Sequence, residues 1–213
     1  MDTIIRFFQE GGTFMYPIAF ILAIGLAITL ERFIFLSREK SSNRRSFEEV
    51  LPMLQKRDFR AALNYTNSSE AKISTIFAAG INRISTGRRE DIELAMEEGV
   101  MEAIPQLEKR TQYVATLANI ATLMGLLGTI MGLIAAFTAV ANAAPADKAT
   151  LLSQSISVAM NTTAFGLMAA IPLLLSHTFL QAKTNEIVDS IEMAGVKFLN
   201  IVTERKPTPT KEG

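Results

Sequence analysis

Three long stretches of this chain carry almost no charged side chain, and they constrain the fold more than any other feature. They are 11–30, 111–146 and 149–183. A helix needs about 20 predominantly apolar residues to cross the hydrocarbon core of a bilayer, and each stretch provides them. The sequence therefore predicts an all-α integral membrane protein. Its three transmembrane helices are expected at 15–35, 117–142 and 156–180.

The composition excludes several classes of site. The chain has 213 residues, 49% of them hydrophobic, and its formal net charge is zero, so it lacks the basic excess of a nucleic-acid-binding protein. It contains no Cys and a single His, which excludes disulfides, zinc–thiolate sites, iron–sulfur sites and a Cys nucleophile. Since no phosphate loop or nucleophile–base pattern is present, we expect neither an enzyme nor a resident cofactor.

The distribution of Lys and Arg predicts the orientation in the membrane. Residues 31–110 hold 14 of them, whereas the connection between the second and third spans holds only Lys148. The segments expected in the cytoplasm are 36–116 and 181–205, and those expected on the periplasmic side are 1–14 and 143–155. The first span is not expected to be a signal peptide, because Asp2 and Glu10 precede a long apolar run.

The charged segment after the first span has the pattern of helices and turns. Ser46 and Glu49 have the spacing of a capping box, which predicts that a helix begins at Ser46. The polar stretches 66–69 and 85–91 predict turns.

A long helix is expected to lead into the second span. Apolar residues recur at helical spacing after residue 91, and Pro105 is the one strong breaker before the apolar run. We therefore predict a single helix over about 89–141, with a kink at Pro105. The third span is expected to continue as a cytoplasmic helix, and 206–213 to be a disordered tail.

Polar residues interrupt the third apolar stretch at "AMNTTAFGLMAAIP". Asn161, Thr162 and Thr163 lie where hydrocarbon is the expected solvent, and Ser153 and Ser157 precede Asn161 at intervals of four, on one helix face. Polar residues in membrane helices usually face a bundle interior or a water-filled cavity. The stripe therefore predicts the wall of a polar path. The alternatives are hydroxyls bonded to their own helix and hydrogen bonds that only join helices.

The second apolar stretch contains "GLLGTIMG". Gly128 and Gly132 form a GxxxG pattern that Gly125 extends, and Gly166 offers a small residue on the third span. Small residues let membrane helices approach closely, so we predict that these glycines pack the second span against the third. Thr129 lies among them and would reach the Thr162–Thr163 pair if the two spans are antiparallel neighbours.

Neither of these spans contains Asp, Glu, Lys or Arg. Neutral hydroxyls coordinate a cation or hold a water chain, but they do not titrate near neutral pH. An ion path would therefore need a carboxylate from a partner chain. Glu31 and Arg32 close the first span and are expected to be interfacial anchors, with a role in the ion path as the alternative. His177 is expected to be hydrogen-bonded or to reach the interface rather than to relay protons.

The three spans, "GLLGTIMGL" in the second and "TTAFGLMAAIP" in the third resemble the MotA/TolQ/ExbB family. The short N-terminal segment is similar to ExbB and TolQ more than to MotA. This resemblance implies a homopentameric ring around two copies of a single-span ExbD/TolR/MotB-like protein that supplies a membrane Asp. It also implies a bacterial inner-membrane complex in which ion flow drives work at the periplasm or outer membrane, as in TonB-dependent transport through a TonB-like protein.

The family's site residues transfer to two positions of this chain. Thr129 and Thr163 fall at the pore threonines of the second and third spans, whereas Val158 replaces the Glu usual in ExbB and TolQ. Thr162 and Thr163 form a Thr pair that resembles the Thr pair of the sodium-driven stator of this family. Hydroxyls with one partner carboxylate suit Na⁺, which we favour slightly over H⁺. The predicted ion path consists of Ser157, Asn161, Thr129, Thr162 and Thr163.

Two other classes of function stay open. A membrane scaffold would use the polar stripe only for assembly, and a secondary transporter would show inverted repeats or broken spans, which the sequence lacks. The sequence also leaves open which process is driven: TonB-dependent uptake, Tol-like envelope maintenance or motility.

Overall fold

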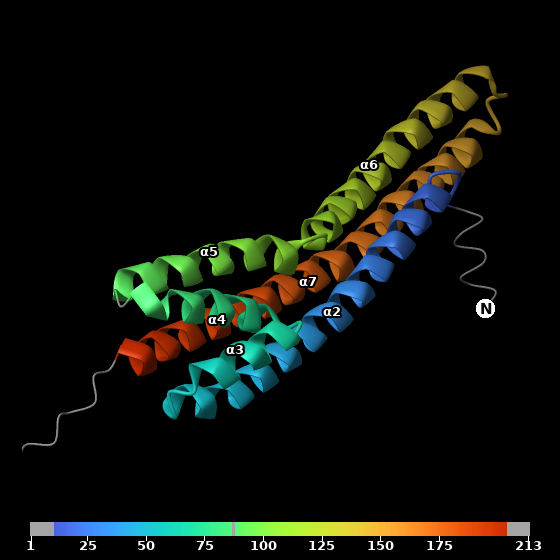
Figure 1. The fold of residues 1–213 in the computed structure, drawn as a ribbon. Coiled ribbons are helices and arrows are strands. Elements are labelled where there is room, and N and C mark those ends of the chain that lie inside the picture. Colours follow the sequence, from blue (N-terminus) through green and yellow to red (C-terminus); the bar gives the residue numbers. More distant parts are fainter. Residues whose placement is uncertain (1–10, 87, 204–213) are drawn as a thin grey trace, which may run out of the picture. The chain divides into compact units, whose positions relative to one another are not determined.

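The computed structural model describes residues 11–86 and 88–203, and every regular element in these ranges is a helix. The chain divides into two compact units (Figure 1). The first unit combines Met1–Phe33 with Arg110–Gln181, and the second combines Ile34–Lys109 with Ala182–Gly213. The predictions for 1–10 and for the tail 206–213 concern residues outside the described ranges.

The three predicted membrane spans lie in three long helices. These are α2 (Met15–Gln55), α6 (Thr111–Asn142) and α7 (Lys148–Thr203). Each contains a stretch long and apolar enough to cross a membrane, which confirms the all-α fold with three helices able to span a bilayer. Phe20, Leu123 and Leu175 are 67%, 62% and 67% exposed in the isolated chain. Large apolar side chains at such exposure indicate a surface covered by lipid or by other protein.

In the first unit, α2 and α7 run parallel. Gly25 lies under the side chain of Leu173, and the ring of Phe33 stacks on that of Phe179 with centroids 6.0 Å apart. The two contacts occur in the same order along both helices, which fixes the direction. Met15 and Ile18 are fully buried near the start of α2.

The second unit adds four shorter elements to the remainder of α2 and α7. They are α3 (Phe59–Ser68), α4 (Lys72–Arg83), a 3₁₀ turn (Ile84–Thr86) and α5 (Arg89–Glu108). Its core centres on the buried ring of Phe77, which stacks on Phe198 at 5.0 Å and lies 6.1 Å from Phe47. The helices end and begin where the polar stretches predicted turns, after Ser68 and before Arg89.

The predicted helix start at Ser46 is wrong. α2 continues through this position to Gln55, and the buried hydroxyl of Ser46 contacts the hydroxyl of Ser74 on α4. Val50 and Leu54 follow Ser46 at intervals of four and are also buried. This buried face extends the helix, and its tertiary packing outweighs the local preference of Ser for a cap.

The prediction of one helix over 89–141 is also wrong. The chain leaves the helical conformation at Lys109 and Arg110, and Arg110 adopts a left-handed conformation with φ 65°. Pro105 lies inside α5 and does not end it. A left-handed residue also follows α2, at Arg57 with φ 58°. A non-glycine residue in this region is uncommon, so local sequence gave no signal for either helix end.

Candidate functional site

The polar residues of the second and third spans lie where α6 and α7 touch through small residues. A Cβ atom added to Gly166 would lie 2.8 Å from the carbonyl oxygen of Ala121 and 2.9 Å from the Cα of Gly125. A Cβ atom added to Gly132 would lie 2.8 Å from the Cβ of Ala159. The contacts run in opposite order along the two helices, so α6 and α7 are antiparallel. The glycines let the backbones meet, as packing through small residues requires.

This close approach brings the hydroxyls of Thr129 and Thr163 into direct contact. The carbonyl oxygen of Gly125 lies 3.2 Å from the Thr129 hydroxyl and 3.0 Å from the Thr163 hydroxyl. Three oxygen atoms from two helices therefore converge at one point. Both threonine side chains are half-buried, so the cluster is reachable from the surface of this chain. We call these three oxygens the hydroxyl cluster.

The hydroxyl cluster has the chemistry of a cation or water site rather than of a proton shuttle. Each hydroxyl donates one hydrogen and accepts through two lone pairs, and the carbonyl only accepts. Oxygen donors of this kind suit hard cations. Within 11–86 and 88–203, no group of three or more His, Cys, Asp or Glu residues could hold a metal ion.

Thr162 has a different set of contacts from its neighbour Thr163. Its side chain is 2% exposed, and its hydroxyl lies 2.6 Å from the carbonyl oxygen of Gly11 and 2.9 Å from that of Val158. Its methyl group lies against Gly128, which has no side chain to displace it. Thr162 thus fastens the segment before α2 to α7, and its hydroxyl already has acceptors within the chain.

The rest of the predicted polar stripe remains accessible. Ser153 and Ser157 are exposed and Asn161 is half-buried on the surface of the first unit. Val158 is half-buried, and its side chain approaches Gly12. The stripe is therefore available to water, to a partner helix or to another copy of the chain.

The charged residues at the end of the first span differ from each other in exposure. Glu31 is exposed and pairs with Arg110 at 3.6 Å, so its partner is in the same chain. Arg32 is 3% exposed, so its side chain is buried within the chain. His177 is half-buried, and its Nε2 atom has no hydrogen-bond partner among the described residues.

Two features were missed by the sequence interpretation, and the first is the carbonyl of Gly125. The signal for it was the spacing of four between Gly125 and Thr129, at which a Thr hydroxyl returns to the carbonyl of its own helix. In the sequence alone this pattern is an alternative to a site, whereas in the structure the same carbonyl also lies within hydrogen-bond distance of Thr163.

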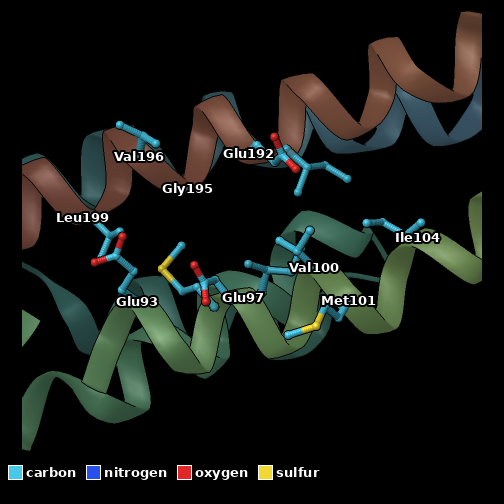
Figure 2. A pocket seen from close by; sticks show the side chains of 12 residues that line it. Glu93, Glu97, Val100, Met101, Ile104, Glu192, Gly195, Val196 and Leu199 are labelled. Carbon is cyan, nitrogen blue, oxygen red and sulfur yellow. The ribbon is translucent and has the colours of Figure 1, made fainter. Parts of the chain in front are cut away.

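The second feature is a groove of about 420 Å³ within the second unit, between α5 and the end of α7 (Figure 2). Its floor is apolar and includes Val100, Ile104 and Leu199, and Glu93 and Glu97 project into it from α5. Glu192 on α7 adds a third carboxylate to the lining. The groove would attract a basic side chain rather than an anion, and it contains none of the predicted site residues.

Comparison with known proteins places the chain among relatives of one family. The family model described as the MotA/TolQ/ExbB proton channel family matches residues 68–193, more than half of the chain. A biopolymer transport protein ExbB homolog of Methanothermobacter thermautotrophicus is 26% identical over 193 residues, 90% of this chain and 67% of that protein. Biopolymer transport protein ExbB of Aquifex aeolicus is 30% identical over 109 residues, 51% of this chain and 72% of that protein. Tol-Pal system protein TolQ of Haemophilus influenzae is 34% identical over 93 residues, 44% of this chain and 40% of that protein.

Proposed function

The chain belongs to the MotA/TolQ/ExbB proton channel family, and we propose that it is the ion-conducting subunit of an ExbB/TolQ-type stator in the inner membrane. In this proposal the subunit couples the flow of Na⁺ or H⁺ to mechanical work at the periplasm or outer membrane, as in TonB-dependent transport. In this role the chain conducts the ion and performs no covalent chemistry.

The contact between the Thr129 and Thr163 hydroxyls carries this proposal. Two polar side chains on different apolar helices meet at the point of closest backbone approach, next to the carbonyl of Gly125. Polar groups in the membrane are costly and are usually retained for an ion or substrate path. We place Ser157 and Asn161 along the approach to this point, because they continue the polar face of α7 and remain accessible.

The missing carboxylate requires a partner. Val158 stands where ExbB and TolQ usually carry Glu, and α6 contains no acidic residue. We propose that two copies of an ExbD/TolR/MotB-like single-span protein bring a membrane Asp to the hydroxyl cluster. A homopentamer of this chain would surround them, with a TonB-like protein as a further component.

The oxygen donors favour Na⁺ slightly over H⁺ in this proposal. Two hydroxyls, one carbonyl and one partner carboxylate supply hard oxygen ligands, the type that alkali and alkaline-earth cations prefer. Thr162 joins this set only if its hydroxyl releases the carbonyl of Gly11, to which it now lies at 2.6 Å. We therefore give Thr162 a supporting role beside Thr163. In the alternative, the partner Asp carries H⁺ alone.

The orientation follows from the charge distribution. The 14 Lys and Arg residues of 31–110 place this segment in the cytoplasm by the positive-inside rule, together with the end of α7. The N-terminus and the 143–147 connection then lie on the periplasmic side.

Native mass spectrometry of the complex, extracted gently from the membranes of its own host, tests the proposal first. Five copies of this chain with two copies of a small single-span protein would support the stator, and the identity of that protein would indicate the process driven. A monomer or dimer without such a partner would leave the membrane scaffold as the better account. Ion flux into vesicles containing the purified complex, compared in Na⁺ and in K⁺ at fixed pH gradient, then distinguishes Na⁺ from H⁺.

A further inference from the structure

A small basic pocket lies within the second unit, and it shares no lining residue with the groove of Figure 2. It has a volume of about 230 Å³ and is formed by α2, α7 and the start of α4. Three cationic side chains line it, Lys40, Arg44 and Lys197, and the described residues of its lining include no carboxylate. Nothing in the ion path uses this pocket, so its chemistry is independent of the proposed function.

The buried amide of Asn43 gives the pocket an unsatisfied donor. Asn43 is 3% exposed and lines the pocket, and its Oδ1 atom accepts a hydrogen bond from the backbone N–H of Ile73 at 3.1 Å. That bond fixes the orientation of the amide, because only the oxygen accepts from an N–H. The Nδ2 atom is then buried, and it has no hydrogen-bond partner among the described residues. A buried amide donor left unpaired costs about 1–3 kcal/mol, which indicates that an acceptor belongs there.

The cations around this donor are held in place but not neutralised by buried acids. Lys40 pairs with Glu186 at 2.5 Å and Arg44 pairs with Glu48 at 2.9 Å, and all four side chains are about half exposed or more. Exposed pairs of this kind contribute little and are readily shared with a stronger anion. Lys197 lies 5.7 Å from the centre of the Phe47 ring, which forms another wall of the pocket.

We propose that this pocket binds a phosphate group. A phosphate offers several acceptor oxygens and up to two negative charges, which match the Asn43 donor and three surrounding cations better than one carboxylate does. Two kinds of ligand could carry this phosphate group into the pocket. Lys40 follows the predicted end of the first span by five residues, or about 8 Å of helix, so an anionic lipid headgroup is within reach. A soluble phosphorylated compound is the other source.

The full-length chain in nanodiscs tests the proposal. Binding of inorganic phosphate is followed by ³¹P NMR in nanodiscs of a neutral lipid. In parallel, native mass spectrometry compares retention of phosphatidylglycerol with that of phosphatidylcholine from mixed discs.

The decisive variant is Asn43→Asp. It keeps an oxygen for the Ile73 N–H and replaces the donor by a second carboxylate oxygen that repels phosphate. A second variant, Lys197→Gln, leaves the hydrogen bonds of Asn43 untouched. Arg60→Gln, an exposed cation on α3 outside the pocket, is the matched control. Loss of a hydrogen bond to a charged group corresponds to a loss of affinity of about tenfold or more, which we expect for Asn43→Asp.

Each outcome decides the proposal. Phosphate binding in neutral discs that both pocket variants weaken and Arg60→Gln leaves intact supports the site and a soluble ligand. Selective retention of phosphatidylglycerol that the pocket variants abolish supports the site and a lipid ligand. If neither probe binds, or if Lys197→Gln and a folded Asn43→Asp bind as well as the unmodified chain, the proposal is wrong. The cations would then serve a contact between chains.

Discussion

The hydroxyl of Thr129 on α6 contacts the hydroxyl of Thr163 on α7, and both lie within hydrogen-bond distance of the carbonyl of Gly125. The contact exists because Gly125 and Gly166 let the two helix backbones meet. The glycines set the distance between the backbones of α6 and α7, and the threonines supply the hydroxyl oxygens that meet there. Substitutions of the glycines should change how closely the two helices approach. Substitutions of the threonines should change only the oxygen ligands, so experiments can distinguish the two kinds of variant.

Replacing Thr163 by Val should remove ion flux while leaving assembly intact. Valine has the shape of threonine without the oxygen, so the helices can still pack while the hydroxyl cluster loses one ligand. Because losing a hydrogen bond to a charged group costs about 1.5–3 kcal/mol, ion flux in vesicles should fall by about tenfold or more. Thr163→Ser should retain most of it. Thr178→Val is the control, since Thr178 is exposed on α7 and bonds only its own helix at Leu174. Equal flux in the Thr163 and Thr178 variants would favour a scaffold.

Replacing Thr162 by Val should affect stability more than ion selectivity. Its hydroxyl bonds the carbonyl of Gly11, and the loss of a hydrogen bond between membrane segments costs about 0.6 kcal/mol on average. The midpoint of thermal unfolding in detergent should therefore fall modestly, while the ratio of Na⁺ to H⁺ flux stays unchanged. A changed ratio of Na⁺ to H⁺ flux, with an unchanged midpoint of thermal unfolding, would indicate that the Thr162 hydroxyl is a ligand of the ion.

Replacing Gly166 by Ala should force α6 and α7 apart. The added Cβ would lie 2.8 Å from the carbonyl oxygen of Ala121 and 2.9 Å from the Cα of Gly125, and neither is a flexible side chain that could move aside. Overpacking of this kind typically costs about 1–3 kcal/mol. Gly195→Ala on the same helix is the matched control, because its Cβ would meet only a Met96 methyl at an ordinary 3.5 Å. Thermal unfolding should separate the two variants, and equal midpoints would contradict the close approach.

The sequence predicted the spans and the Thr129–Thr163 contact because both depend on strong, regular signals. Apolar runs without charge identify membrane helices regardless of tertiary detail. Small residues on two such helices, with a Thr among them, restrict how the helices can pack. The contact between Thr162 and Gly11 had no comparable signal, since 151 residues separate them in the chain.

The helix ends in the second unit were harder to predict. Ser46 has the local chemistry of a cap, but burial against Ser74 keeps it inside α2. Arg110 lies in a run that favours helix, and it adopts a left-handed conformation although it is neither Gly nor Asn. At Ser46 a tertiary contact overrides a weak local preference.

Removing one hydroxyl of the Ser46–Ser74 pair should cost more than removing both. The two buried hydroxyls hydrogen-bond each other between α2 and α4. Ser46→Ala leaves the Ser74 hydroxyl buried without this partner, at a cost of about 1–3 kcal/mol, whereas the double alanine variant removes both polar groups. Chemical denaturation of the two single variants and the double variant should show the double close to the unmodified chain. Additive losses would mean that the hydroxyls find other partners.

Replacing Arg110 by Gly should stabilise the chain even though it removes an ion pair. Arg110 has φ 65°, and a left-handed conformation costs an ordinary residue about 1–2 kcal/mol. Its pair with Glu31 is long, at 3.6 Å, and both side chains are about half exposed, so the pair contributes about 0–1 kcal/mol. Arg110→Gln removes the pair and keeps the strain, so it should be neutral or slightly destabilising. Arg110→Val, with a branched Cβ, should be the least stable of the three. Thermal unfolding in one detergent ranks them, and a Gly variant less stable than the Gln variant would show that the Arg110 side chain, rather than its backbone, governs the break between α5 and α6.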